Sequence, residues 1–115
     1  MSFNYKYPIT SGYTTVNNGT QTNAVLAAPG ANKLYRVTGG IVIVQVAAAG
    51  GGGIVSLQDG STNVLRWDAN SLASFLFAFT EIGLAFGTNN AINIVVSGAA
   101  TQATVYCALT GYIVQ

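Results

Sequence analysis

Charged side chains are scarce in this sequence. Four of its 115 residues are Lys or Arg and three are Asp or Glu, whereas an average soluble domain of this length carries about 29 charged residues. The net charge of +1 is not gathered in a basic cluster, which tight binding to nucleic-acid phosphates requires. We therefore expect no nucleic-acid partner. We expect a surface made of Thr, Ser, Asn, Gln and Gly, or one that a neighbouring chain partly covers.

Histidine is absent, and Cys107 is the only cysteine. Without histidine, one chain cannot form a Ser-His-Asp or Cys-His catalytic site, or a zinc site of the usual composition. A single cysteine excludes an internal disulfide, and in mid-strand we expect Cys107 to pack as a small hydrophobe. We therefore predict that the chain is not an enzyme and that it binds no metal, cofactor or small-molecule substrate.

The acidic residues Asp59, Asp68 and Glu81 are too dispersed to suggest a metal site. They form no Asp-x-Asp-x-Asp pattern of the kind that binds calcium, and Asp59 and Asp68 lie in turn-like sequences. Calcium held mainly by backbone carbonyls is the alternative that the sequence leaves open.

Long apolar runs are also missing. No run reaches the roughly 18 residues of a membrane span, so we expect no membrane partner. Residues 1–15, MSFNYKYPITSGYTT, lack the charged n-region and apolar h-region of a secretory signal, and we expect none.

Four consecutive glycines occupy residues 50–53. A phosphate-binding loop of the Walker type would continue with Lys, then Ser or Thr, and open a helix. Here the strand-like IVSLQ follows at once and no lysine is present. We interpret the run as a connection between two strands, where the backbone adopts positive φ or approaches another chain segment closely.

Short β-rich runs separated by turn residues dominate the chain, and no helical periodicity appears. The candidate strands cover residues 24–28, 34–38, 40–47, 54–58, 63–67, 74–79, 91–97 and 103–113. They predict an all-β fold: one antiparallel β-sandwich or jelly-roll domain of about eight strands, over residues 24–115. The polar and aromatic residues 1–23 predict an extended N-terminal arm, with a strand-like lead-in packed on its own domain as the alternative.

Several candidate strands are apolar on both faces. In residues 40–47, for example, Ile41 and Ile43 alternate with valines, although an antiparallel strand with one face in water should alternate apolar and polar residues. An apolar surface of this size marks an association site, and we predict an obligate homo-oligomer. The aromatic residues expected in its subunit interface or core are Phe75, Phe77, Phe79, Phe86, Tyr106 and Tyr112.

Trp67 lies between Arg66 and Asp68. This arrangement suggests either a half-buried strand end, which we favour, or a patch on which a sugar stacks.

Three segments resemble small virion structural proteins of tailed bacteriophages, most closely the trimeric jelly-roll decoration (cement) proteins of phage heads. They are LYRVTGGIVIVQV, IVSLQDGSTNVLRW and GTNNAINIVVSGAATQATVYCALTGYIVQ. The likeness covers residues 24–115 and rests on the DGST hairpin, the NNAINIVVSGA strand and the closing VYCALTGY.

The resemblance implies a homotrimer on the capsid surface of a virion, bound to the major capsid protein and to neighbouring decoration trimers. It also implies an N-terminal arm that reaches the capsid, with contacts expected from Phe3, Tyr5, Tyr7 and Tyr13. The alternative function is a knob or tip domain of a phage tail or spike that binds a host receptor or glycan.

Overall fold

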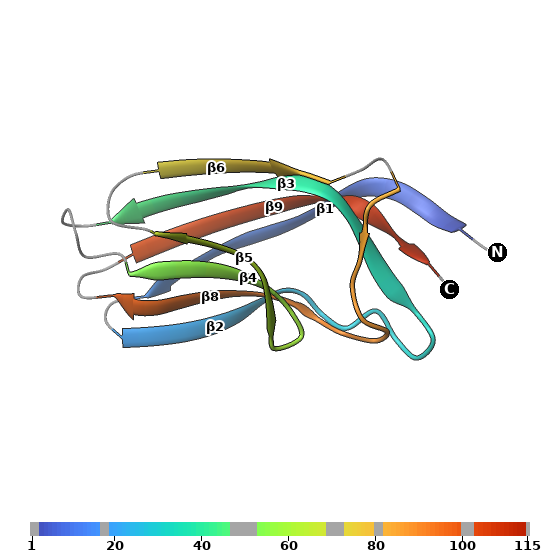
Figure 1. The fold of residues 1–115 in the computed structure, drawn as a ribbon, viewed down its shortest axis with the longest axis horizontal. Helices are drawn as coiled ribbons and strands as arrows, with labels where there is room; N and C mark the ends of the chain where they lie inside the picture. Colours follow the sequence, from blue (N-terminus) through green and yellow to red (C-terminus); the bar gives the residue numbers. More distant parts are fainter. Residues whose placement is uncertain are drawn as a thin grey trace.

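Two antiparallel sheets face each other in this protein (Figure 1). The structure, a computed structural model, describes residues 3–16, 19–46, 53–68, 73–79, 82–99 and 103–114. Its strands are β1 (Phe3–Val16), β2 (Gly19–Leu26), β3 (Leu34–Val46), β4 (Ile54–Asp59), β5 (Thr62–Asp68), β6 (Ala73–Ala78), β7 (Leu84–Ala85), β8 (Ile92–Ala99) and β9 (Ala103–Val114). In these ranges there is no helix that is long and apolar enough to cross a membrane.

The strand order defines a jelly roll. One sheet, here called the β3 sheet, has the order β1-β9-β3-β6, with β7 also paired to β3, and the other, the β4 sheet, has the order β2-β8-β4-β5. Leaving out the two-residue β7, the strands pair from the ends of the chain inward: β1 with β9, β2 with β8, β3 with β6, and β4 with β5. This nesting arises when one long antiparallel hairpin wraps into two sheets. It confirms the predicted all-β jelly roll.

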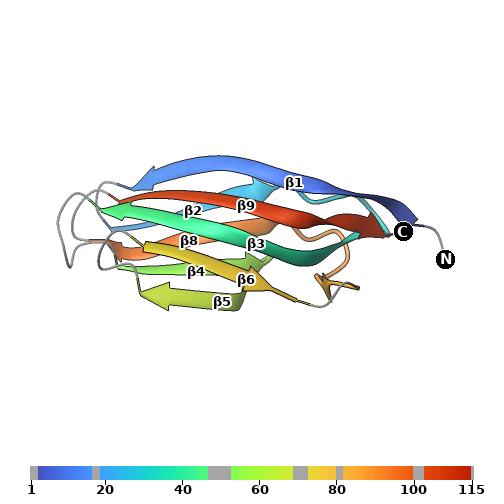
Figure 2. The same cartoon turned by 90° about the horizontal axis from the view of Figure 1, so that it is seen from above.

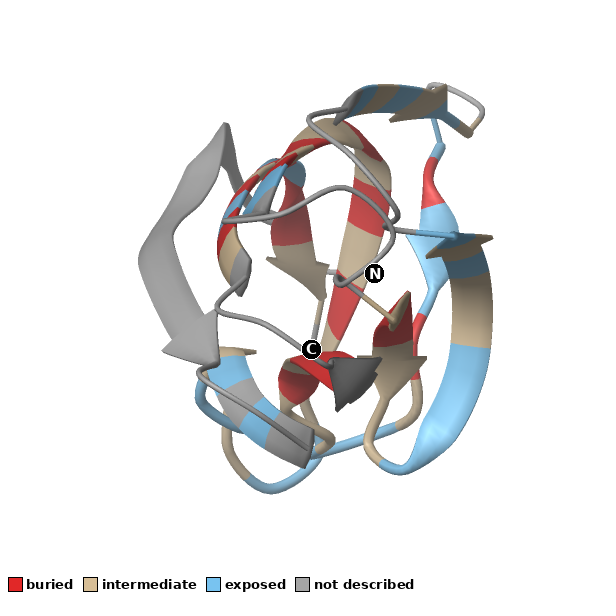
Figure 3. Cartoon of the chain, turned by 90° about the vertical axis from the view of Figure 1, so that its left-hand side faces the viewer, coloured by how far each residue is buried: buried red, intermediate tan, exposed pale blue. Residues whose placement is uncertain are grey.

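The core lies between the two sheets and consists mainly of β-branched and aliphatic side chains. Alternate residues of each central strand point inward, as Val42 and Val44 do on β3 and Val55 and Leu57 do on β4, and these four side chains are fully buried. Figure 3 shows the resulting alternation of buried and more exposed positions along the strands. β-branched residues suit these positions because they pack well on a pleated surface.

Aromatic rings close one open side of the sandwich, where β5 and β6 are the outermost strands. Trp67 on β5 stacks on Phe75 of β6 with ring centroids 5.3 Å apart, and its ring lies 5.8 Å from that of Phe77. Phe79 continues the row, 5.8 Å from Phe77. Since β5 and β6 belong to different sheets, these contacts join the sheets directly, and each aromatic pair adds about 1 kcal/mol beyond its buried area.

Residues 3–16 and 19–23 lie within the two sheets, which corresponds to the alternative of a strand-like lead-in packed on its own domain and not to a separate arm. β1 pairs along β9 from Phe3 with Val114 to Val16 with Ala103, and the expected boundary at residue 23 falls inside β2. Both are outermost strands of their sheets (Figure 2). Proline and polar residues are tolerated at such edges because one side of the backbone needs no partner strand, so the sequence of β1 does not resemble a core strand.

Deleting residues 1–16 tests this placement. Removal of β1 takes away the backbone pairing along β9 and turns β9 into an edge strand, so we expect the melting temperature to fall by at least about 10 °C. Thermal unfolding followed by circular dichroism measures the effect, with deletion of residues 1–2 as the control. An unchanged melting temperature would show that these residues are a dispensable arm.

Candidate functional site

The outer face of the β3 sheet is apolar where its central strands meet. Ile41 of β3 pairs with Leu76 of β6 and with Ala108 of β9, and Ile43 pairs with Tyr106 of β9. Directly paired residues of an antiparallel sheet share a face. Leu76 is 81% exposed and Tyr106 is 37% exposed. We call these five residues the outer patch.

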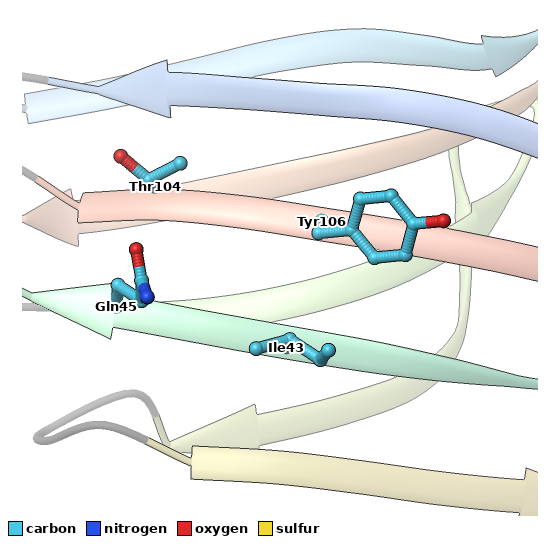
Figure 4. Close-up of a pocket in the computed structure, with 4 residues that line it drawn as sticks. All are labelled: Ile43, Gln45, Thr104 and Tyr106. Atoms are coloured by element: carbon cyan, nitrogen blue, oxygen red, sulfur yellow. The ribbon is translucent and has the colours of Figure 1, made fainter.

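A shallow hollow indents the outer patch. It has a volume of about 370 Å³ and is lined by Ile43 and Gln45 of β3 and by Thr104 and Tyr106 of β9. Figure 4 shows these four side chains on two neighbouring strands, with the Tyr106 ring and Ile43 toward one end and Gln45 and Thr104 toward the other. The lining combines apolar carbon with an amide and two hydroxyl groups, and it contains no charge.

The outer patch explains the strands that are apolar on both faces. The three runs that showed this pattern most clearly in the sequence form β3, β6 and β9, which are neighbours in one sheet in the order β9-β3-β6. Their inner residues, such as Val42, Cys107 and Phe75, pack in or against the core. Their outer residues therefore combine into one continuous surface.

The outer face of the β4 sheet is more polar. There the buried Ser56 pairs with the exposed Arg66 on β5 and with the buried Val95 on β8, and the Gln58 amide donates a hydrogen bond of 2.8 Å to the Asn63 side-chain oxygen. The two outer faces thus differ in chemistry, and the apolar one is the candidate for association.

One end of the β3 sheet's outer face is covered by the chain itself. The Tyr112 hydroxyl donates a hydrogen bond to the Ile82 carbonyl, and Arg36 Nη1 donates to the Gly83 carbonyl over 3.1 Å. Tyr112 is consequently only 4% exposed, while Ile82 is 66% exposed. The segment around Ile82 ends the open part of the face and adds an apolar side chain beside it.

The aromatic residues expected in an interface or core lie in different surroundings. Phe86 and Tyr112 are buried. Phe75, Phe77 and Phe79 pack against the core from β6 and the residue after it. Of the six, Tyr106 lies in the outer patch. The interface residues expected from the sequence did not include Ile41, Ile43 and Leu76. The alternation of these residues with core residues along the same strands could have identified them.

The residues expected to contact the capsid lie in β1. Tyr13 is the register partner of Tyr106, and Tyr7 that of Gly111, while Phe3 pairs with Val114; Tyr5 lies between them in the strand. Their backbone therefore forms the outermost strand beside β9. Their role as capsid contacts stays a prediction.

Trp67, which suggested a sugar-stacking patch, is directed toward Phe75 and Phe77 and packs against the core. Its ring therefore joins the two sheets, which agrees with the half-buried strand end favoured from the sequence.

The Asp59 carboxylate ties two turns together. It accepts hydrogen bonds from the Gly87 amide at 3.0 and 2.9 Å and from the Asn90 side chain at 2.9 Å. Beside it, the Gly60 amide donates to the Ala91 carbonyl over 2.9 Å, and the Gly60 carbonyl accepts from Asn93 at 2.8 Å. Asp59 thus holds the β4–β5 turn against the segment that leads into β8. Within the described ranges no three His, Cys, Asp or Glu side chains gather as a metal site.

Replacing Asp59 tests this clamp. Asp59→Ala leaves the Gly87 and Asn90 donors without their acceptor, so we expect the free energy of unfolding to fall by about 2 kcal/mol. Asp68→Ala removes an acid from an exposed position of β5 and serves as the control, with an expected change below about 0.5 kcal/mol. Urea unfolding measures both. Equal effects would contradict the clamp.

The glycine run joins the two sheets. Residues 50–52 lie outside the described ranges. Gly53 has a φ of 74° and directly precedes β4, while β3 ends at Val46. This agrees with a strand-to-strand connection and with the positive φ that glycine accommodates.

Cys107 packs in the core, 2% exposed. Burial raises the pKa of its thiol to about 12, because the thiolate would lose its hydration.

Iodoacetamide labelling of Cys107 and urea unfolding as a function of pH test this environment. At pH 8 we expect iodoacetamide to label the folded protein at least about a hundredfold more slowly than the urea-unfolded protein, since the thiolate is the nucleophile. The raised pKa keeps the thiol neutral in the folded state. Its contribution to stability is therefore complete below the ordinary pKa of 9.0 and is lost as the pH rises toward about 12. Rapid labelling of the folded protein would contradict the burial.

Comparisons with known proteins define no family for this chain. No family model matches the sequence, and no curated protein is similar to it. Among solved structures, the chain is similar to infectious bursal disease virus, Gx strain, with 16% identity and a TM-score of 0.44. The match covers 95% of this chain but 30% of the viral one.

Two further structures are similar at comparable levels. They are the decameric BFDV capsid protein, with 12% identity, a TM-score of 0.36 and coverage of 95% of this chain and 92% of that chain, and the CBM36-1 domain of a xylanase from the hindgut metagenome of Trinervitermes trinervoides. The latter has 13% identity, a TM-score of 0.36 and coverage of 98% and 87%. The likenesses are too weak to assign a function.

Proposed function

We propose that this chain is a virion structural protein: a decoration (cement) protein that trimerises on the capsid surface of a phage head and bridges capsid subunits. The observation that carries the proposal is the apolar outer patch, displayed on three adjacent strands of a jelly roll. Burying such an apolar surface against a partner stabilises the assembly. The resemblance of residues 24–115 to phage decoration proteins supports the same role.

The chemistry of the surface suits a protein that binds a preassembled lattice. Apolar contact contributes roughly 25 cal/mol for each Å² that is removed from water, and it needs no charge on either partner. A protein that binds the assembled shell but not free subunits stabilises the shell by mass action. Three copies in one trimer would strengthen individually modest contacts through multivalency.

The proposed partners are the major capsid protein and neighbouring decoration trimers. In this arrangement β1 presents its free edge outward from β9, since it is the outermost strand of the β3 sheet. Phe3, Tyr5, Tyr7 and Tyr13 would then reach the capsid from a strand of the domain. The alternative role as a receptor-binding tip relied on Trp67 as a glycan contact, and the packing of that ring on Phe75 does not favour it.

Particles with and without the protein test the proposal. We expect many copies per particle, distributed over the head, and a lower temperature of capsid disruption when the protein is absent. Image reconstruction of the intact particle and thermal release of the genome measure these outcomes, and adding the purified protein back to depleted particles is the control. A few copies confined to the tail would contradict the proposal.

A further inference from the structure

We infer that the outer patch binds the same patch of a second copy of this chain, so that two β3 sheets pack face to face. The inference makes the proposed function more specific and rests on the same surface: it assigns the outer patch to a contact between copies of this chain, and leaves contact with the capsid to other surfaces such as the edge strand β1. This contact differs from a trimer contact: a patch that binds itself relates two copies by a twofold axis.

The outer patch contains both halves of a knob-and-hole contact. Leu76 is the knob, since it projects from β6 with 81% of its surface exposed. The hole is the hollow of about 370 Å³ lined by Ile43, Gln45, Thr104 and Tyr106. Knob and hole lie on the same sheet face but on different strands. A twofold axis through the patch would therefore place each Leu76 in the hollow of the other copy.

The charge distribution favours a copy of the same chain over a charged partner. Between Thr38 and Gln45 of β3, neither β3 itself nor its register partners on β6 and β9 include a charged residue. A charged partner would bury its charges against this face without compensation, which costs several kcal/mol for each ion. Two copies of the outer patch meet without burying any charge.

The open part of the face is large enough for a contact of modest size. Between Thr104 and the covered end at Tyr112, seven residues of β9, each rising about 3.4 Å, and four strands at about 4.8 Å spacing give a face of roughly 450 Å². Two such faces would bury roughly 900 Å² in total, in the range of weaker interfaces below about 1,200 Å². Sheet faces of this kind pack about 10 Å apart with interdigitating side chains, which the alternation of large Leu76 and small Ala108 permits.

The first test measures the assembly mass by sedimentation velocity over a range of protein concentrations. We expect the wild type to form an even-numbered assembly: a dimer, or a hexamer if trimers pair through this face. Leu76→Asp should halve that mass and raise the dissociation constant of the face-to-face contact at least tenfold. Ala24→Asp, at an exposed edge position of the β4 sheet paired with Asn93, is the matched control and should behave as the wild type.

The second test traps the contact directly. Leu76 and Thr104 lie on β6 and β9, which are separated by β3. Leu76 pairs with Ile41 and Thr104 with Gln45, four residues further along β3, so their Cα atoms within one chain are roughly 17 Å apart and cannot form a disulfide. The double variant Leu76→Cys/Thr104→Cys should therefore form an intermolecular disulfide under mild oxidation, whereas Leu76→Cys/Ala24→Cys should not.

Several results would overturn the inference. A wild type that is monomeric at 100 µM, an unchanged mass for Leu76→Asp, or a trimer in both proteins would each do so, as would the absence of the predicted cross-link. A monomer that binds immobilised glycans through Tyr106 would instead make the hollow a sugar site. The sedimentation and cross-linking tests address only the contact between copies of this chain. Image reconstruction of the particle tests the virion location, so a failure of one proposal can be told from a failure of the other.

Discussion

The pairing of β3 with β9 is the interaction on which the rest of the structure depends. The two strands remain in register from Leu34 with Val114 to Val46 with Ala103, with one shift near Thr38. Because the paired positions are at least 57 residues apart in sequence (Val46 and Ala103 are the nearest pair), forming this contact closes a long loop, which is costly in entropy. Once formed, it supplies neighbours for β1 on one side and β6 on the other.

Both faces of the β3–β9 pair carry apolar side chains. The inner residues build the core with the β4 sheet, while the outer residues create the outer patch. An ordinary sandwich strand needs apolar residues on one face only. In the isolated chain, the outer apolar residues of β3 and β9 remain in contact with water and add little to stability. They stabilise the protein fully only when another surface covers them. This links the composition of the chain to its expected association.

The remaining contacts keep the sandwich closed. Trp67 and the phenylalanines of β6 join the two sheets along the side where both have an outermost strand. At one end of the molecule, Asp59 joins two turns, and the Asn89 side chain accepts a hydrogen bond of 3.0 Å from the Gly30 amide. The few charged and polar side chains in these positions therefore hold connections together, and the stretch of β3 from Thr38 to Gln45 with its partners on β6 and β9 contains no charge.

Local sequence was sufficient for the class of fold, because alternation, turn residues and the lack of helical periodicity act over a few neighbouring positions. It placed most strands of residues 24–115 and identified β3, β6 and β9 as apolar on both faces. It could not show that these three strands are neighbours, that Trp67 turns inward, or that residues 3–16 complete the β3 sheet. Those outcomes depend on pairing between residues far apart in the chain. Tertiary structure alone therefore decided that scattered outer residues such as Leu76 and Tyr106 form one surface, since only the sheet brings them together.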